Sequence, residues 1–401
     1  MLFAAASAAG CSSGQRSGGS SSDLRIVVSA PVSSQPWIAT SIKNGAQLAA
    51  SELESQGGVT VGTAKRHLSV QVLDNGGSST KAAADARTAV REHAAMLLID
   101  GVGASSVAQV TDPANLPVFI CFDGGDGLID PSKWPTLFRM APADQPMARR
   151  LADYIANSHP SVGLLSDDSD YGQQGRAALH KAFGIDGVRI VSDGQLPARV
   201  ADVTPQVLGA KQAGATRLIV WASAADVAAI VQAVHEVGWS VPIITGTTGE
   251  DPLVRQRLAQ HPDWLHDVTF VSFRMTAEVG PAPFEAFRGR YEAKFGAEHV
   301  GVSQNGKAVI QPPDWAMFSY DAVRLVMSAL ASGGSAGTAL MEKLNQVSIV
   351  GANGDYRGYG PAQHEGVNPS DMYFARFDGF TFVPVGDDPL SDTLPSVNQL
   401  S

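Results

Sequence analysis

Short apolar runs alternate with amphipathic helical patterns along this chain, and that alternation restricts the possible fold more than any other feature. The run Leu24–Ala30 is typical of a buried strand, and a stripe with the spacing of one helical face follows it. The apolar residues of that stripe are Ile38, Ile42, Ala46, Ala49 and Leu53. Further strands are expected at residues 68–74, 96–100 and 118–122, with Ala-rich helices such as 81–92 between them. Strands joined through helices run parallel, so the pattern predicts an α/β fold of mostly parallel sheet covered by helices on both faces.

A second series of the same kind begins after Pro142. Its expected strands are residues 162–166, 188–192, 218–222 and 241–245, followed by 268–273. Helices are expected at 283–295 and 315–331, and a hairpin at 372–377 and 380–385. About 380 residues are more than one hydrophobic core usually serves. We therefore expect two similar α/β units, with a chain that crosses between them more than once.

The N-terminus has the order of an export signal. An apolar run, Leu2–Ala9, precedes Gly10 and Cys11, and a Ser/Gly-rich stretch follows. This order predicts a signal segment that is removed, a lipid-carrying Cys11 and a flexible tether to the membrane surface. Ala8 stands where such signals usually have Leu, so an Ala-rich N-terminus with an incidental cysteine is the alternative.

Charge, cysteine content and motifs exclude several classes of protein. The formal net charge of −10 argues against a nucleic-acid surface, which needs clustered Lys and Arg. The chain has two cysteines, and lipid on Cys11 would leave Cys121 without a disulfide partner. The longest candidate for a membrane span, Leu218–Val234, is interrupted by Asp226. Neither H-E-x-x-H nor C-x-x-C occurs, so we expect no enzyme, no metal site and no cofactor.

Nine short motifs occur in the order found in one known family. They are Ser29–Val32, Gly45–Ala49, Gln56–Val59, Leu73–Asp74, Gly101–Ser105, Phe138–Arg139, Asp144–Gln145, Asp170–Gly172 and Tyr320–Val323. In this order the chain resembles the type I periplasmic binding fold, specifically the solute-binding lipoproteins of branched-chain amino acid and amide ABC importers. The resemblance implies two doubly wound parallel-sheet lobes, joined by a three-strand hinge, with a ligand cleft between them.

The resemblance also implies a division of the chain into lobes. Residues 1–22 are the lipoprotein signal and tether, 23–141 with 274–348 form lobe 1, 142–273 with 349–386 form lobe 2, and 387–401 form a C-terminal tail. In open parallel sheets ligands bind beyond the carboxyl ends of the strands, where loops run into helix N-termini. Candidate ligand residues are therefore sought in those loops of each lobe.

The loop after the first expected strand contains Ser34, Gln35 and Trp37, whose hydroxyl, amide and ring can face a ligand. The alternative is that Ser33 or Ser34 caps the next helix and Trp37 is a packing residue.

Gly103, Ala104 and Ser105 follow the third expected strand and open a helix, which suits a carboxylate. In the resembling family the serine that matches Ser105 binds the α-carboxylate of the ligand. Capping of the helix by Ser105 is the alternative.

Phe122, Asp123 and Gly124 end the next strand, where the resembling amino-acid binders have small residues and a Thr hydroxyl. Asp123 departs from that pattern and favours a cationic or hydroxyl-rich group on the ligand. The alternative is that Asp123 only shapes the following glycine turn.

In the second unit, Tyr171 matches a ligand-contacting tyrosine of the family, whose ring covers the ligand's side chain. Trp221 and Ser223 end one strand, and Thr248 and Glu250 follow another. In the family an aromatic residue near the first position and an acid near the second close the pocket and pair with the ligand's ammonium. Ser223 replaces the aromatic residue, and Glu250 serves equally well as a partner in helix capping.

The function implied is that of an extracytoplasmic, lipid-anchored substrate-binding protein of an ABC importer, which captures an amino acid, an amide or a similar polar solute. Its expected partners are that solute, membrane permease subunits and the membrane through its lipid, with a monomer as the default. A lipid-tethered sensor of the same fold is the alternative. An NAD(P)-dependent oxidoreductase is a remote one, because Gly101–Ser106 followed by Asp123 imitates a dinucleotide fingerprint without its third glycine.

The lipid anchor gives a direct prediction. Changing Cys11→Ser removes the thiol that would carry the diacylglycerol, so the variant is expected in the soluble fraction after cell fractionation, whereas the unmodified chain sediments with membranes. Retention of the Ser variant on membranes would contradict a lipid at this position.

Overall fold

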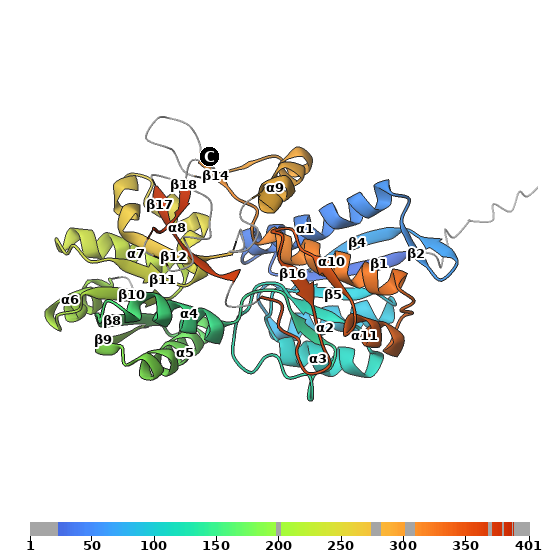
Figure 1. The fold of residues 1–401 in the computed structure, drawn as a ribbon, viewed down its shortest axis with the longest axis horizontal. Coiled ribbons are helices and arrows are strands. Elements are labelled where there is room, and N and C mark those ends of the chain that lie inside the picture. Colours follow the sequence, from blue (N-terminus) through green and yellow to red (C-terminus); the bar gives the residue numbers. More distant parts are fainter. Residues whose placement is uncertain are drawn as a thin grey trace, which may run out of the picture.

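The computed structural model describes residues 23–197, 202–273, 282–300, 309–367, 371–378, 381–386 and 388. The expected lipidation site at Cys11 and nearly all of the expected C-terminal tail lie outside these residues. Two parallel sheets, each covered by helices, form two lobes that lie side by side (Figure 1). The expected α/β fold with parallel sheets in two lobes is therefore confirmed.

The first sheet has five parallel strands. Its order is β4 (Leu68–Asp74), β1 (Leu24–Ala30), β5 (Met96–Ile99), β6 (Val118–Ile120) and β7 (Leu137–Arg139). Ile26 and Val28 of β1 point into a core shared with α1 (Pro36–Ser55) and α10 (Ala316–Ala331). Val27 points to the other face, into a core shared with α2 (Ser79–Arg91) and α3 (Ala104–Thr111). Both faces are buried, which explains why the middle of β1, residues 26–28, is continuously apolar and not alternating.

Helices α1 and α10 pack closely because α1 has a glycine at their contact. A Cβ at Gly45 would lie 2.0 Å from the carbonyl oxygen of Ala316 and 2.2 Å from the hydroxyl of Ser319. Any larger residue at this position would force the two helices apart.

The second sheet has seven strands, five of them parallel. Its order is β18 (Thr381–Pro384), β17 (Tyr373–Asp378), β12 (Val268–Ser272), β11 (Ile243–Thr245), β10 (Arg217–Trp221), β8 (Ser161–Asp167) and β9 (Arg189–Leu196). Strand β17 runs antiparallel to β12 and forms the expected hairpin with β18. Helices α4 (Asp144–Ala156) and α5 (Asp170–Asp186) cover one face, and α6 (Thr204–Gln212) and α7 (Ala224–Glu236) cover the other.

The remaining elements are short or lie at the edges. They are the hairpins β2 (Val59–Val61) with β3 (Ala64–Arg66), β13 (Glu298–Val300) with β14 (Val309–Gln311), and β15 (Ser348–Val350) with β16 (Tyr356–Gly358). The helices are α8 (Pro252–Arg257), α9 (Ala282–Phe295) and α11 (Thr338–Leu344), with 3-10 turns η1 (Asp112–Ala114), η2 (Thr247–Glu250) and η3 (Pro262–Asp267). Among the described helices, none has both the length and the apolar character that crossing a bilayer requires.

The chain passes between the two main sheets at three places. It leaves the first sheet after β7, leaves the second after β12, and returns to the second before β17. Between the last two passages, β15 and β16 pack on α10, and the backbone N–H of Arg139 donates to the carbonyl of His364. Residues 348–366 thus lie with the first lobe, so the return falls after Val367, later in the chain than the expected boundary at 349. The reason is that the β15–β16 hairpin covers α10 before the chain crosses.

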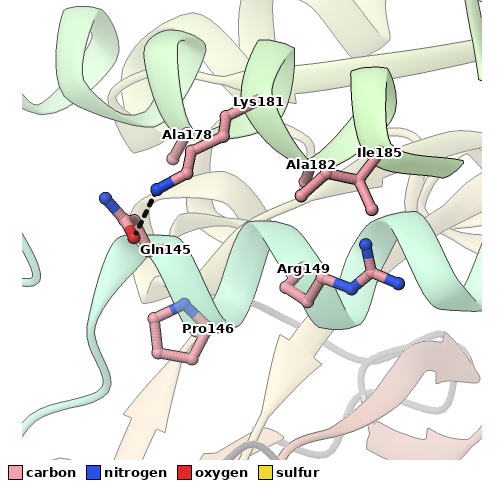
Figure 2. Close-up of a pocket in the computed structure, with 7 residues that line it drawn as sticks. All are labelled: Gln145, Pro146, Arg149, Ala178, Lys181, Ala182 and Ile185. Carbon is pink, nitrogen blue, oxygen red and sulfur yellow. Dashed lines mark hydrogen bonds between the residues drawn. The ribbon is translucent and has the colours of Figure 1, made fainter.

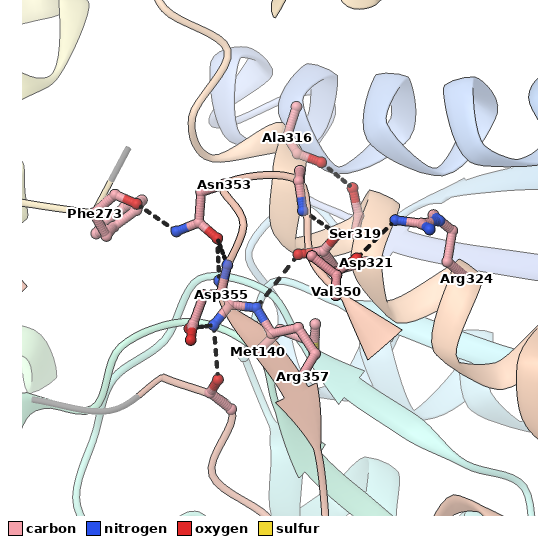
Figure 3. Close-up of polar contacts among 12 residues, drawn as sticks. Met140, Phe273, Ala316, Ser319, Asp321, Arg324, Val350, Asn353, Asp355 and Arg357 are labelled. Carbon is pink, nitrogen blue, oxygen red and sulfur yellow. Dashed lines mark hydrogen bonds and ion pairs between the residues drawn. The ribbon is translucent and has the colours of Figure 1, made fainter. Parts of the chain in front are cut away.

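A buried arginine ties these passages together (Figure 3). Arg357 is 1% exposed; its Nε donates to Asp321 Oδ2 of α10 at 3.3 Å, and its Nη1 donates to Asp355 and to the carbonyl of Gly366. Asn353 accepts from Arg357 Nη2 at 3.3 Å and donates to the carbonyl of Phe273, just beyond β12, at 2.9 Å. Burial raises the pKa of Asp321 to about 6, against the opposing effect of Arg357. This network therefore connects the first lobe to the strand end where the chain leaves the second.

Removing the guanidinium should be costly, because it leaves two buried carboxylates without their cation. We expect Arg357→Ala to lower the free energy of unfolding by about 3–5 kcal/mol, measured by urea denaturation. The control is Arg176→Ala, which removes a partly exposed ion pair with Asp193 and should cost no more than about 1 kcal/mol. Equal losses in the two variants would contradict a structural role for the buried network.

Candidate ligand site at the junction of the lobes

The candidate ligand residues lie at the carboxyl ends of parallel strands, in the loops that follow them or in the first turns of the next helices. In the first lobe these loops follow β1, β5 and β6, and in the second they follow β8, β10 and β11. Carboxyl ends of parallel strands share one edge of their sheet, so each lobe presents its loops together.

Two aromatic residues of the second lobe lie side by side. The rings of Tyr171, at the start of α5, and Trp221, at the end of β10, have centroids 5.8 Å apart at an angle of 34°. A Cβ at Gly246 would lie 2.9 Å from the Tyr171 hydroxyl, which also lies near Thr247 and Thr248. Burial raises the pKa of Tyr171, so its phenol stays neutral. The structure thus places Tyr171, Trp221 and Thr248 in one cluster of polar and aromatic side chains.

Glu250 is in contact with the first lobe. It lies fully buried in η2, and its Oε1 accepts a hydrogen bond of 2.9 Å from Trp315 Nε1, just before α10. Trp315 stacks on Phe122 with centroids 4.0 Å apart, and Phe122 meets the edge of Trp37 at 5.8 Å. These contacts run from the start of α1 to η2. Through Trp315 they connect the candidate residues Trp37 and Phe122 of the first lobe to Glu250 of the second.

Sequence reasoning missed Trp315. It carries no motif, and its hydrogen-bond partner is 65 residues away in the chain. The one available signal is a tryptophan directly before a long apolar helix.

Arg139 organises the turn after β6. It is 2% exposed, and its Nη1 donates to the carbonyls of Asp123 at 3.2 Å and Gly125 at 2.9 Å. Its Nε and Nη2 form a bidentate pair with the carboxylate of Glu365, at 2.8 and 2.7 Å. Asp123 Oδ1 accepts from the N–H of Gly125 at 2.8 Å, as in the alternative in which Asp123 shapes the turn. Burial raises the pKa of this carboxyl.

Asp144 is the first residue of α4, where the chain enters the second lobe. Its backbone N–H donates to the carbonyl of Gly124 at 2.8 Å, which attaches α4 to the turn of the first lobe. The residue is 1% exposed. Burial, together with the negative charge of Asp123, raises the pKa of the Asp144 carboxyl to about 7. Sequence reasoning placed Asp144 in a family motif but gave it no role in the site.

The loops after β1 and β5 lie on the same edge of the first lobe. Ser105 is exposed in the first turn of α3, and Ala104 is buried. The N-cap of α3 is Gly103, with φ of 67°, so Ser105 does not cap this helix. Ser34 and Gln35 are exposed, and a Cβ at Gly77 would lie 3.3 Å from the Ser34 hydroxyl.

The structure decides which of three serines cap helices. The N-cap of α1 is Gln35, without a side-chain hydrogen bond, so neither Ser33 nor Ser34 caps that helix. Ser223 caps α7: its hydroxyl accepts from the N–H of Asp226 at 3.2 Å and donates to the Asp226 carboxylate at 2.7 Å.

A separate hollow of about 250 Å³ lies between α4 and α5 (Figure 2). It is lined by Gln145, Pro146, Arg149, Ala178, Lys181, Ala182 and Ile185. None of the candidate ligand residues lines it. Lys181 donates to Gln145 Oε1 at 3.2 Å, and Arg149 pairs with Asp153 and Asp186, so its polar side chains bind one another or near neighbours. Within the described residues no group of three His, Cys, Asp or Glu side chains could hold a metal ion.

Two parallel α/β lobes that meet through polar and aromatic loops define the class of two-lobed solute-binding proteins. A family model described as periplasmic binding protein matches residues 24–381, and the chain belongs to that family. No curated protein matches the chain significantly.

Solved structures show the same fold at low sequence identity. The branched-chain amino acid transporter substrate-binding protein LivJ from Streptococcus pneumoniae, in complex with isoleucine, is 19% identical, with a TM-score of 0.74 over 90% of this chain and 97% of that one. An ABC transporter substrate-binding protein from Desulfitobacterium hafniense with Leu is 18% identical, with a TM-score of 0.72 over 90% and 100%. A solute-binding protein from Rhodopseudomonas palustris BisB5 with 3,4-dihydroxybenzoic acid is 18% identical, with a TM-score of 0.71 over 92% and 99%.

The resemblance inferred from the ordered motifs is thereby confirmed. The chain is a binding protein and not an enzyme, because the family to which it belongs is one of binding proteins. The oxidoreductase alternative is set aside on the same grounds.

The contact between the lobes is testable through Trp315. Trp315→Phe keeps a ring against Phe122 but removes the N–H donor to Glu250, so the free energy of unfolding should fall by about 1–3 kcal/mol in urea denaturation. In a Glu250→Ala background the same substitution should lower the free energy of unfolding by clearly less, because the acceptor of the hydrogen bond is already absent. Equal costs in the two backgrounds would contradict an energetic role for this hydrogen bond.

Proposed function

We propose that this chain is the extracytoplasmic solute-binding component of an ABC importer, lipid-anchored through Cys11, which captures an amino acid or amide between its lobes and delivers it to membrane permease subunits. The observation that carries the proposal is the cross-lobe contact of candidate residues, from Trp37 and Phe122 through Trp315 to Glu250. The ligands named for the related structures, isoleucine and leucine, support the amino-acid class.

In this proposal each lobe binds a different part of the solute. The N-terminus of α3, with the exposed hydroxyl of Ser105 and the N–H groups beside it, binds the carboxylate. Tyr171 and Trp221 cover the side chain, and Thr248 and Glu250 accept from the ammonium group. A buried carboxylate such as Glu250 suits an ammonium partner, because two opposite charges are best desolvated together.

Closure of the lobes is the proposed mechanism of capture. A ligand shifts the equilibrium only by the difference between its affinities for the open and closed forms. Moving a protein from 1:99 to 99:1 in favour of the closed form requires about 5.5 kcal/mol of such difference. Contacts from the second lobe, above all Tyr171 and Glu250, are the proposed source of that difference.

The test is calorimetric titration of the chain with amino acids and amides, preceded by a thermal-shift screen of the same compounds. A ligand at one hundred times its dissociation constant adds about 2.7 kcal/mol of stability, which a melting curve detects. If no amino acid and no amide gave a thermal shift or a calorimetric signal, the proposed solute class would be contradicted.

The carboxylate assignment gives a sharper prediction for any amino acid that binds. Ser105→Ala should weaken binding by about 1–3 kcal/mol, the usual value of a hydrogen bond to a charged group. Ser106→Ala, one residue further along α3, is the matched control and should change affinity little. A change below about 0.3 kcal/mol in the Ser105 variant would contradict carboxylate binding at this helix end.

A further inference from the structure

The carboxylate of Asp144 has unusual surroundings for a buried charged group. Its side chain is 1% exposed, and neither of its oxygens has a hydrogen-bond donor among the residues that the structure describes. Buried carboxylates in proteins are nearly always paired or hydrogen-bonded, because desolvating an isolated charge is expensive. The Asp144 carboxylate can therefore accept a hydrogen bond from a bound ligand.

The surroundings hold this carboxylate against the turn between the lobes. A Cβ at Gly124 would lie 2.4 Å from Asp144 Oδ1, and a Cβ at Gly125 would lie 2.0 Å from Gln174 Oε1. Two adjacent glycines thus allow acceptor oxygens from α4 and α5 to approach the same turn. Like the Asp144 oxygens, Gln174 Oε1 has no hydrogen-bond donor among the described residues.

The charges that act on Asp144 are mostly negative. Asp123 and Asp126, on the loop after β6, add negative charge, and Arg139 of β7 is the opposing cation. The guanidinium of Arg139 already binds Glu365 through two nitrogens and two carbonyls of the turn. Tyr171 of α5, whose pKa Asp144 helps to raise, adds a neutral phenol. The local balance therefore favours a positively charged donor.

We propose that Asp144 is a recognition site for a positively charged group on the solute, with Gln174 Oε1 as a second acceptor, so that the preferred solutes are amino acids with a cationic side chain. This inference rests on the proposed function, because it assigns the solute class of the same site. The rings of Tyr171 and Trp221 suit such a ligand, since aromatic faces attract cations and cover aliphatic stems.

A pH dependence follows from the protonation of Asp144. The cation binds the ionised carboxylate, whose pKa of about 7 in the free protein lies well above that of an ordinary aspartate. Affinity for a cationic amino acid should therefore rise between about pH 6 and about pH 8, by up to tenfold per pH unit below the pKa. Affinity for a neutral amino acid should change little over this range, since no proton must leave Asp144 when it binds.

The experiment is calorimetric titration of the chain with matched pairs of probes. L-lysine is compared with L-norleucine, and L-arginine with L-citrulline, so that each pair differs mainly in the charge of the side chain. We expect the cationic member to bind at least about tenfold more tightly at pH 8. This comparison needs no variant, so it stands even if a substitution at Asp144 impairs folding.

The variants then assign the preference to one residue. Asp144→Asn keeps the shape but removes the charge, so it should reduce the preference for lysine over norleucine by about tenfold. Asp153→Asn, on an exposed part of the same helix, is the matched control and should keep the preference. Removing a buried charge should also raise the melting temperature of the ligand-free Asp144 variant at pH 8, and by less at pH 5, where the wild-type carboxyl is already protonated.

The outcomes separate this inference from the proposed function. Tighter binding of neutral amino acids, or equal binding within each pair, would overturn the cationic site and leave the amino-acid class intact. A preference for lysine that survives Asp144→Asn would overturn the assignment to Asp144. Binding of none of the four probes would overturn the cationic site and count against the proposed amino-acid class as well.

Discussion

The candidate site depends on the hydrogen bonds of one buried group, the guanidinium of Arg139. It holds the turn after β6 through the carbonyls of Asp123 and Gly125, and it binds Glu365 from a segment 226 residues away. That turn also accepts the first backbone N–H of α4, which begins the second lobe. One side chain thus fixes the loop that carries candidate ligand residues and the point where the chain crosses between lobes.

The junction contains a second buried cation, Arg357, and the two arginines serve the same end. Segments that cross between lobes leave backbone and side-chain polar groups in a dry environment, where each unpaired group is costly. Arginine suits this position because its planar, multidonor head group satisfies several carboxylates and carbonyls at once. Each arginine makes four hydrogen bonds within the chain, and neither donates to the carboxylate of Asp144. This difference is the physical basis for expecting a cation on the solute.

Much of the fold was predictable from the sequence, and for a physical reason. Strands such as Leu24–Ala30 and Leu68–Asp74 are buried on both faces or flanked by clear helical stripes, so their pattern is local and strong. The hairpin β2–β3 and the strand β7 were missed, because three-residue strands carry too little periodicity. The return of the chain to lobe 2 was expected too early in the sequence. The packing of β15 and β16 on α10 is a contact between distant segments, which no local pattern encodes. The candidate site divides in the same way: Tyr171, Trp221 and Glu250 stand at recognisable strand ends, whereas Trp315 and Asp144 acquire their roles from partners brought near only by the fold.

We propose that one solute binds at the junction of the lobes, with its carboxylate at the start of α3 and a cationic group at Asp144. A crystal structure of the chain grown with L-lysine tests it most directly. We expect lysine in contact with both lobes, with its side-chain nitrogen within hydrogen-bonding distance of the Asp144 carboxylate. Lysine bound only in the hollow between α4 and α5, or with its side chain directed away from Asp144, would contradict binding at the junction of the lobes.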